Sequence, residues 1–127
     1  MSCSCSGNGS NEGLFLPREA KILHAHQPTA TEKHFTLQLV GGERLEFQPG
    51  QILEVGVMGY GEIPIGLASS PTRTDTFEIV VRTVGRVSTA INKKDNGDSL
   101  WGRGPLGHGF DLDALRGRDG LVVAGGS

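Results

Sequence analysis

The stretch KHFTLQLVGGERLEFQPGQILEVGV, residues 33–57, alternates apolar and polar residues in three short runs. A period of two places every second side chain on the same face of a strand, which is typical of a half-buried β-strand. Turn residues separate the runs, at positions 41–42 and 49–50. The stretch therefore predicts three consecutive strands joined by short turns. Their apolar positions are Phe35, Leu37 and Leu39, then Leu45 and Phe47, then Leu53, Val55 and Val57.

Further strand patterns lie on both sides of this stretch. They are REAKILHAH at residues 18–26, IPIGLAS at 63–69, TFEIVVRTV at 76–84 and DSLWGRG at 98–104. Many short strands with tight connections are typical of a closed barrel, which leaves no strand edge exposed. We expect an all-β fold, a six-stranded antiparallel Greek-key barrel.

Length, charge and composition limit the possible classes of protein. A chain of 127 residues fits one domain with a single core. The net charge is -2 and no block of like charges occurs, so we expect neither a nucleic-acid partner nor a charged membrane surface. No apolar stretch approaches the roughly 20 residues that cross a bilayer, and the N-terminus lacks the pattern of a signal peptide. We therefore expect no membrane insertion and a cytoplasmic location.

Two groups of residues are candidate metal ligands. Cys3 and Cys5 lie in a segment rich in Ser, Gly and Asn, and we expect residues 1–15 to be a disordered tail. Two thiolates fill only half of a tetrahedral site, so a metal there would need ligands from another chain. His24 and His26 share a strand face, but no third ligand is near in sequence. We expect no metal site.

Residues 84–94, VGRVSTAINKK, interrupt the β pattern. Ser88 is a good N-cap residue and the two lysines suit a helix end, so a short helix is predicted near residues 88–94. The first turn of such a helix, directly after a glycine, can bind an anion such as a phosphate. Arg82 and Arg86 flank this turn. The alternative is that Ser88 is only a cap and that both arginines are solvated.

The chain ends in LVVAGGS, residues 121–127. A continuous apolar run is typical of a parallel strand buried on both faces, and glycines after it favour a phosphate-approaching turn. Gly125 and Gly126 would form that turn. We expect residues 16–118 to be the barrel domain and residues 119–127 to begin a truncated nicotinamide nucleotide-binding domain.

Five segments in this order carry a family resemblance: PGQILEV, PIGLASSP, FEIVVRTVGRVSTAI, GRGPLGHGF and LVVAGG. Together they resemble the FAD-binding domain of the ferredoxin:NADP reductase superfamily, over residues 16–127. The sequence looks most like the flavin (gamma) subunit of hydrogenases, sulfhydrogenases and anaerobic sulfite reductases, with the electron-transfer subunit of dihydroorotate dehydrogenase as a near relative. The resemblance implies FAD, with FMN as an alternative, on the barrel and NAD(P) on a second domain.

The resemblance also implies where the cofactor lies. In the family the flavin ring lies beside a strand with an Arg-x-Tyr-Ser motif, and residues 63–66 of this chain replace that motif by Ile-Pro-Ile-Gly. This strand can touch the ring but offers no side chain to the phosphates, which would depend on residues 85–89 and on Arg82 first or Arg86 second. The implied cofactor-binding residues are Ile63, Pro64, Ile65, Gly66, Leu67, Val80, Val81, Arg82, Gly85, Arg86, Val87, Ser88 and Thr89.

The function implied is that of a flavin-dependent NAD(P)H oxidoreductase. It would relay electrons between a nicotinamide nucleotide and an iron–sulfur or hydrogenase-type partner subunit, and we expect no catalytic side chains because the flavin carries the chemistry. Since the motif strand is degenerate, a flavin-free barrel that acts as a docking module is the alternative. Trp101 and His108 are interpreted as packing and loop residues near the junction with the second domain.

Overall fold

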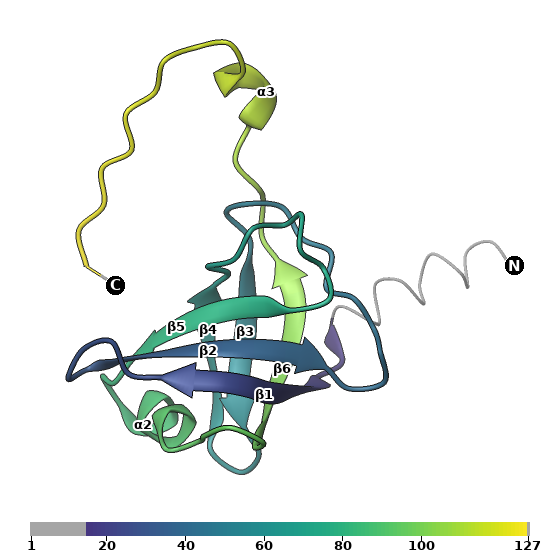
Figure 1. Cartoon of the computed structure of the whole chain (residues 1–127), viewed down its shortest axis with the longest axis vertical. Helices are drawn as coiled ribbons and strands as arrows, with labels where there is room; N and C mark the ends of the chain where they lie inside the picture. Colours follow the sequence, from purple (N-terminus) through teal and green to yellow (C-terminus); the bar gives the residue numbers. More distant parts are fainter. Residues whose placement is uncertain (1–14, 127) are drawn as a thin grey trace, which may run out of the picture.

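Six strands and two short helices form the part of the chain that the computed structural model describes, residues 15–126 (Figure 1). The strands follow the alternating runs of the sequence, because every second side chain enters a common interior. They are β1 (Arg18–His26), β2 (Glu32–Leu39), β3 (Ile52–Val57), β4 (Gly61–Gly66), β5 (Phe77–Arg82) and β6 (Ser99–Leu106). The helices are α2 (Arg86–Asn92) and α3 (Leu112–Leu115).

All strand pairs are antiparallel, in the order β4-β3-β6-β1-β2-β5. Strand β6 lies between β3 and β1, so the last strand joins two groups that form earlier in the sequence. The sheet curls until its outer strands meet at one bridge, between Leu67 and Ile79. The predicted six-stranded antiparallel barrel is confirmed, and it is nearly closed, with an open seam between β4 and β5.

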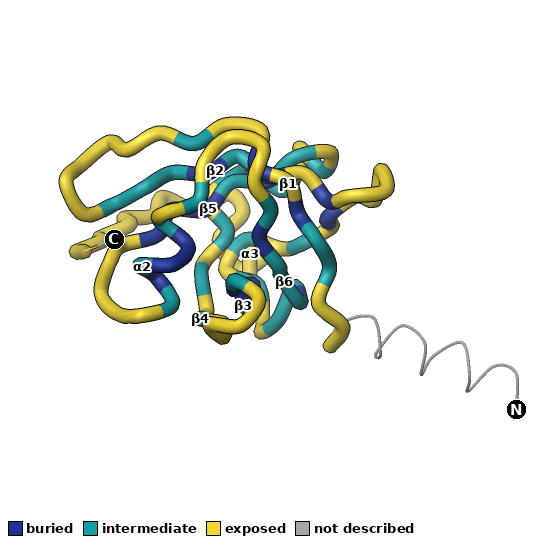
Figure 2. Tube along the Cα trace, turned by 90° about the horizontal axis from the view of Figure 1, so that it is seen from below, coloured by how far each residue is buried: buried dark blue, intermediate teal, exposed yellow. Residues whose placement is uncertain are grey.

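Apolar side chains from every strand except β4 fill the barrel interior, and β4 contributes half-buried residues. Figure 2 shows the buried residues along the chain in dark blue. The predicted alternation in β2 and β5 is confirmed, because their inward side chains are at most 5% exposed. These inward residues are Phe35, Leu37 and Leu39 in β2 and Phe77, Ile79 and Val81 in β5. Burial at a period of two is what holds these segments in the barrel.

The strand predicted at residues 44–47 is wrong. The segment between β2 and β3 belongs to no strand, although Leu45 is buried and Phe47 packs against the core. Leu45 N donates to Thr74 O in the loop before β5, so this segment is held by single contacts rather than by a ladder. In this segment the alternation of apolar and polar residues indicates which side chains are buried, although the backbone pairs with no neighbouring strand.

Helix α2 begins earlier than predicted. It spans Arg86–Asn92 with Gly85 as its N-cap, so Ser88 is not the cap but lies one turn inside the helix. The helix packs against one end of the barrel through Ala90 and Ile91, which are buried (Figure 1). The prediction of a short helix directly after a glycine is confirmed, and its predicted start is corrected.

The segment after β6 leaves the barrel. It contains α3 and then residues 119–126, which are in no helix or strand and are exposed (Figure 1). Leu121, Val122 and Val123 are 90%, 92% and 84% exposed. No helix among the described residues is long and apolar enough to cross a membrane.

Candidate functional site

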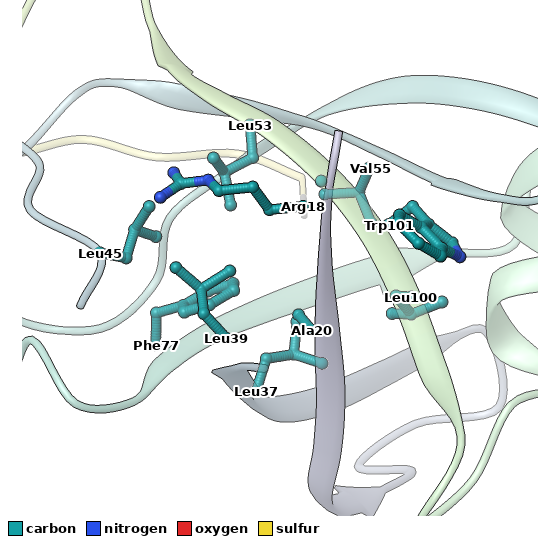
Figure 3. Close-up of a pocket in the computed structure, with 11 residues that line it drawn as sticks. Arg18, Ala20, Leu37, Leu39, Leu45, Leu53, Val55, Phe77, Leu100 and Trp101 are labelled. Carbon is teal, nitrogen blue, oxygen red and sulfur yellow. The ribbon is translucent and has the colours of Figure 1, made fainter. Parts of the chain in front are cut away.

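The barrel interior leaves no room for an organic ligand. A core cavity near the β1 and β6 ends has a volume of about 10 Å³, enough for about one water molecule (Figure 3). Arg18 lies at its side and donates from Nη2 to Gly104 O at 2.8 Å, while Nη1 lies 3.3 Å from Glu43 Oε2. Arg18 thus fastens β1 to β6 at this end. A cofactor site must lie on the barrel surface.

The hairpin of β3 and β4 positions the strand predicted to contact the flavin ring. Its two strands approach closely at Gly56, where an added Cβ would lie only 2.1 Å from Gly61 O. The close approach of the β4 backbone therefore leaves no room for any side chain at position 56. Gly61 itself has a φ of 107°, a conformation that favours glycine, and it begins β4 next to the Val87 side chain of α2. The hairpin brings the start of β4 to the first turn of the helix.

Strand β4 has one face toward the core and one toward solvent. Ile63 and Ile65 pair with Val55 and Leu53 and are half-buried against the core, as is Leu67 just after the strand. Pro64 and Gly66 are exposed. Ile63 and Ile65 thus bury much of their apolar surface against the core.

Gly66 and Gly85 share an unusual freedom. Neither has a positive φ, and an added Cβ at either position would meet no heavy atom within 4 Å. Neither the local backbone conformation nor packing within the described residues therefore requires a glycine at these two positions. Gly120 and Gly125 in the C-terminal segment share this property, so it shows open space at Gly66 and Gly85 and does not by itself show a ligand there.

The turn before α2 is ordered by Ser88. Its hydroxyl accepts from Val84 N and Gly85 N, both at 2.9 Å, and donates to Gly85 O. Thr89 Oγ1 also donates to Gly85 O, at 2.6 Å. Both hydroxyls are therefore committed to the turn, so any anion here would meet backbone N–H groups, and no acidic residue occupies the first turn.

The three β5 residues predicted to line the cofactor differ in accessibility. Val81 is fully buried in the core, so its side chain is not available to a surface ligand, whereas Val80 is half-buried on the outer face. Arg82 is exposed on that face, and its Nε lies 3.6 Å from Glu32 Oε1. A carboxylate thus already partly neutralises Arg82.

Arg86 has a different environment. It is the first residue of α2, and its Nη2 donates to Tyr60 O at 3.1 Å, with the guanidinium 5.9 Å from the Tyr60 ring centre. No carboxylate forms a salt bridge with Arg86 among the described residues. Arg86 therefore lies at the helix turn without a salt bridge among the described residues, whereas Arg82 has one with Glu32. The predicted order, Arg82 before Arg86 as the phosphate partner, stays a prediction. Tyr60 carried no signal in the sequence, because its link to Arg86 exists only across the β4–α2 contact.

A charged pair links β4 to β6 across the intervening strand β3. Arg103 on β6 donates to Glu62 on β4, with Nη2 and Nε at 2.6 and 2.8 Å from Oε1. The hydrogen bond to Glu62 raises the pKa of Arg103 above its ordinary value, and the charges of Glu62 and Glu54 act in the same direction against the effect of desolvation. The pair fastens β4 to β6, which fixes the strand that carries Gly66.

The remaining predicted residues differ in position. Gly126 lines an open pocket with Val80 and Arg82 of β5, and Trp101 shares a depression with Gly61 and Glu62 of β4. Trp101 is half-buried on β6, and it lines a shallow depression with Pro17, Val57 and Met58. His108 is exposed in the loop after β6, and Gly125 and Gly126 are exposed near the chain end. Cys3 and Cys5 lie outside the described residues.

Comparison with known proteins places this surface in context. The gamma subunit of sulfhydrogenase 1 from Pyrococcus furiosus is 37% identical over 119 residues, which is 91% of this chain and 41% of that subunit. The chain is a homologue of sulfhydrogenase gamma subunits. A probable electron-transfer subunit of dihydroorotate dehydrogenase B (NAD(+)) from the same organism is a second homologue, 39% identical over 66% of this chain and 30% of its own length. The resemblance read from the five segments is confirmed. No protein-family model matches the chain.

Solved structures share the barrel. Phthalate dioxygenase reductase superposes with a TM-score of 0.66 at 19% identity, over 78% of this chain and 32% of that protein. This chain therefore has the fold of the FAD-binding barrel of ferredoxin reductases. The chain spans about two fifths of the length of the sulfhydrogenase subunit that it matches.

Proposed function

We propose that the barrel binds a flavin, FAD or FMN, along β4. In the full-length protein it would relay electrons between a nicotinamide nucleotide and an iron–sulfur or hydrogenase-type redox subunit, as an NAD(P)H oxidoreductase. A redox role is supported by the relatives, which include sulfhydrogenase gamma subunits and electron-transfer subunits of dihydroorotate dehydrogenase B. The flavin, the nucleotide and the partner of this chain are our inference.

The main support for the proposal is that Gly66 and Gly85 both face open space. Gly66 ends β4, whereas Gly85 caps the helix that contacts the start of the same strand. Residues 61 and 66 are five steps apart, so the two places are separated by roughly 16 Å along an extended strand. A ligand that contacts both Gly66 and the turn at Gly85 must be elongated. One end must pack on an apolar surface, and the other must carry a negative charge that suits a helix N-terminus. A flavin dinucleotide has that form.

The residues present supply binding and orientation. Gly66 admits the ring and offers its backbone, and the exposed Pro64 on the same face of β4 adds apolar area. The turn at residues 85–89 with Arg86 faces the phosphates. When bound, a flavin accepts two electrons as a hydride and passes them on singly. The chain itself needs to exclude water and to fix the cofactor.

We extend the proposal to the end of the chain. Residues 121–124 expose an apolar run that the barrel does not cover, and two glycines follow it. Such a run gains stability as a buried strand of a second domain. We propose that residues 119–127 begin the nucleotide-binding domain.

Titration with FAD tests the site. The purified chain is stripped of any cofactor, titrated with FAD and followed by flavin fluorescence, and the same is done with Gly66→Leu. A leucine side chain in the open space at position 66 should weaken FAD binding by at least about tenfold, or 1.4 kcal/mol. Gly120→Leu is the matched control, because Gly120 also lacks a positive φ and faces open space.

The result separates the two candidate functions. A wild-type chain that binds FAD and loses it selectively in Gly66→Leu supports the flavin site. A stably folded wild-type chain that stays colourless in excess FAD supports the flavin-free docking module. FAD binding that survives Gly66→Leu unchanged would place the ring elsewhere on the barrel.

A further inference from the structure

Three histidines gather on the outer face of the barrel, on β1 and β2, and His34 lies opposite Val80 of β5. His24 and His26 lie on β1, and His34 lies opposite His26 in the register of β1 and β2. The rings of His24 and His26 stack with centres 5.4 Å apart, and those of His26 and His34 meet edge to face at 4.7 Å. Nδ1 of His26 and Nδ1 of His34 are 3.4 Å apart.

The backbone explains why these rings meet. Ala25 pairs with the buried Phe35 and faces inward, so its neighbours on β1 face outward. The β1–β2 hairpin then brings His34 across from His26, eight residues away in sequence. The partner missing from the sequence pattern around His24 and His26 is thus supplied by the opposite strand.

Glu78 on β5 lies beside the His34 ring. Its Oε2 lies 3.6 Å from His34 Nε2, and the two side chains are only 25% and 22% exposed. A carboxylate beside Nε2 favours the tautomer with the proton on Nε2, which leaves the Nδ1 lone pair free. That lone pair is the one directed to His26. A carboxylate behind the outer nitrogen of an imidazole is the arrangement that metal-bound histidines commonly have.

We propose that His26 and His34 bind a divalent transition-metal ion through their Nδ1 atoms, with Zn²⁺ as the representative ion. Zinc bonds to imidazole nitrogen at about 2.0–2.1 Å, so two ligands at a tetrahedral angle lie about 3.3–3.4 Å apart. The observed separation of 3.4 Å matches this requirement, and rotation of the two edge-to-face side chains would direct both lone pairs at one ion. Imidazole nitrogen suits Zn²⁺, Ni²⁺ and Cu²⁺ and does not suit Mg²⁺ or Ca²⁺.

The site is open to solvent. Among residues 15–126, no group of three or more His, Cys, Asp or Glu side chains is arranged to hold a metal ion, so the chain supplies two ligands and solvent or another molecule the others. Both histidine side chains reach the surface, since His26 is exposed and His34 half-buried. The competing occupant of the same space is a proton shared between the two Nδ1 atoms.

Calorimetric titration with Zn²⁺ distinguishes the two occupants. It is done on the full chain without flavin, in a Cys3→Ser/Cys5→Ser background that removes the thiolates as competing ligands. His26→Gln and His34→Gln should each abolish the binding event, whereas His108→Gln, the matched control in the loop after β6, should leave it unchanged. Mg²⁺ should give no heat with any variant.

Glu78→Gln tests the positioning role. Loss of an outer-shell carboxylate costs on the order of 10–100-fold in metal affinity. In the same variant, ¹⁵N NMR should show the His34 proton moving from Nε2 toward Nδ1, a change that a purely structural role of Glu78 would not produce. The absence of Zn²⁺ binding by the wild-type chain, or equal binding by His26→Gln, His34→Gln and His108→Gln, would overturn the proposal. Because no flavin is present, this result is independent of the proposed function.

Discussion

At the scale of single residues, the Ser88 hydroxyl holds the turn between β5 and α2. It is 2% exposed and accepts the N–H groups of the two residues before the helix. Ser88→Ala removes this acceptor and should lower the free energy of unfolding by about 1–3 kcal/mol, the usual cost of leaving a buried hydrogen-bonding group without its partner. Urea denaturation measures the change. Ser70→Ala, at an exposed serine, should stay within about 0.5 kcal/mol, and an equal loss in both variants would contradict the role given to Ser88.

The two arginines beside this turn give a second prediction. Arg82→Ala combined with Arg86→Ala should cost on the order of 1.5–3 kcal/mol in FAD affinity, because a single charged hydrogen bond to a phosphate contributes in this range. Of the single variants, Arg86→Ala should carry most of the loss, since Glu32 already partly neutralises Arg82. Binding is titrated with FAD and with riboflavin at one fixed salt concentration.

Riboflavin has no phosphate, so its affinity should hardly change in the double variant. Arg44→Ala is the control for a paired surface arginine, because Arg44 lies 3.2 Å from Asp75 in another part of the barrel. Equal losses for both ligands would show that the arginines support the fold instead of the phosphates.

Residue roles were only partly predictable from the sequence. The apolar positions of β2 and β5 could be assigned because period two alone decides which side chains enter the core. The partners of Arg82 and His34 could not, because they lie on neighbouring strands and depend on register. The partners of Ser88 were not predictable either, because its hydroxyl accepts from Val84 N and Gly85 N before the helix, whereas an N-cap serine accepts from N–H groups of the first turn.

At the scale of elements, the β3–β4 hairpin depends on the close approach at Gly56. Gly56→Ala would place a Cβ 2.1 Å from Gly61 O, a backbone atom that cannot rotate away. We expect a loss of unfolding free energy of about 1–3 kcal/mol, the range for an overpacked site, together with weaker FAD binding because β4 must shift. Thermal and urea unfolding measure the first effect.

Gly102→Ala is the matched control for this hairpin. Gly102 lies in β6, lacks a positive φ, and its added Cβ would be 3.9 Å from Glu54 O, an ordinary contact. Its stability should be nearly unchanged. If Gly56→Ala and Gly102→Ala lowered the free energy of unfolding by the same amount, the effect would reflect strand propensity and not the contact with Gly61 O.

The elements themselves were largely predictable, and the exception is instructive. Leu45 and Phe47 alternate as strand residues do, yet their segment has a single backbone link, from Leu45 N to Thr74 O. Alternation records which side chains are buried. It does not record whether a neighbouring strand is present to complete the ladder, which depends on residues far away in sequence.

At the scale of the whole molecule, the barrel and the C-terminal segment should behave as separate units. Leu121→Ala removes side-chain atoms that are 90% exposed, so the free energy of unfolding should stay within about 0.5 kcal/mol. Leu37→Ala makes the same change at a side chain that is 1% exposed and should cost about 2–5 kcal/mol. A substantial loss with Leu121→Ala would show that residues 119–126 pack on the barrel.

The position of β6 governs how the chain is made. Until β6 leaves the ribosome, the nascent chain can form only the β4–β3 hairpin and the β2-centred group, and β1 and β3 each present an unpaired edge. Translation from the end of β5 to the end of β6 lasts about 1–5 s at about 5–20 residues per second. During that interval the edges can pair with another nascent chain. Substitutions that weaken β6 should therefore reduce the yield of folded protein at synthesis more than they reduce the stability of the finished barrel.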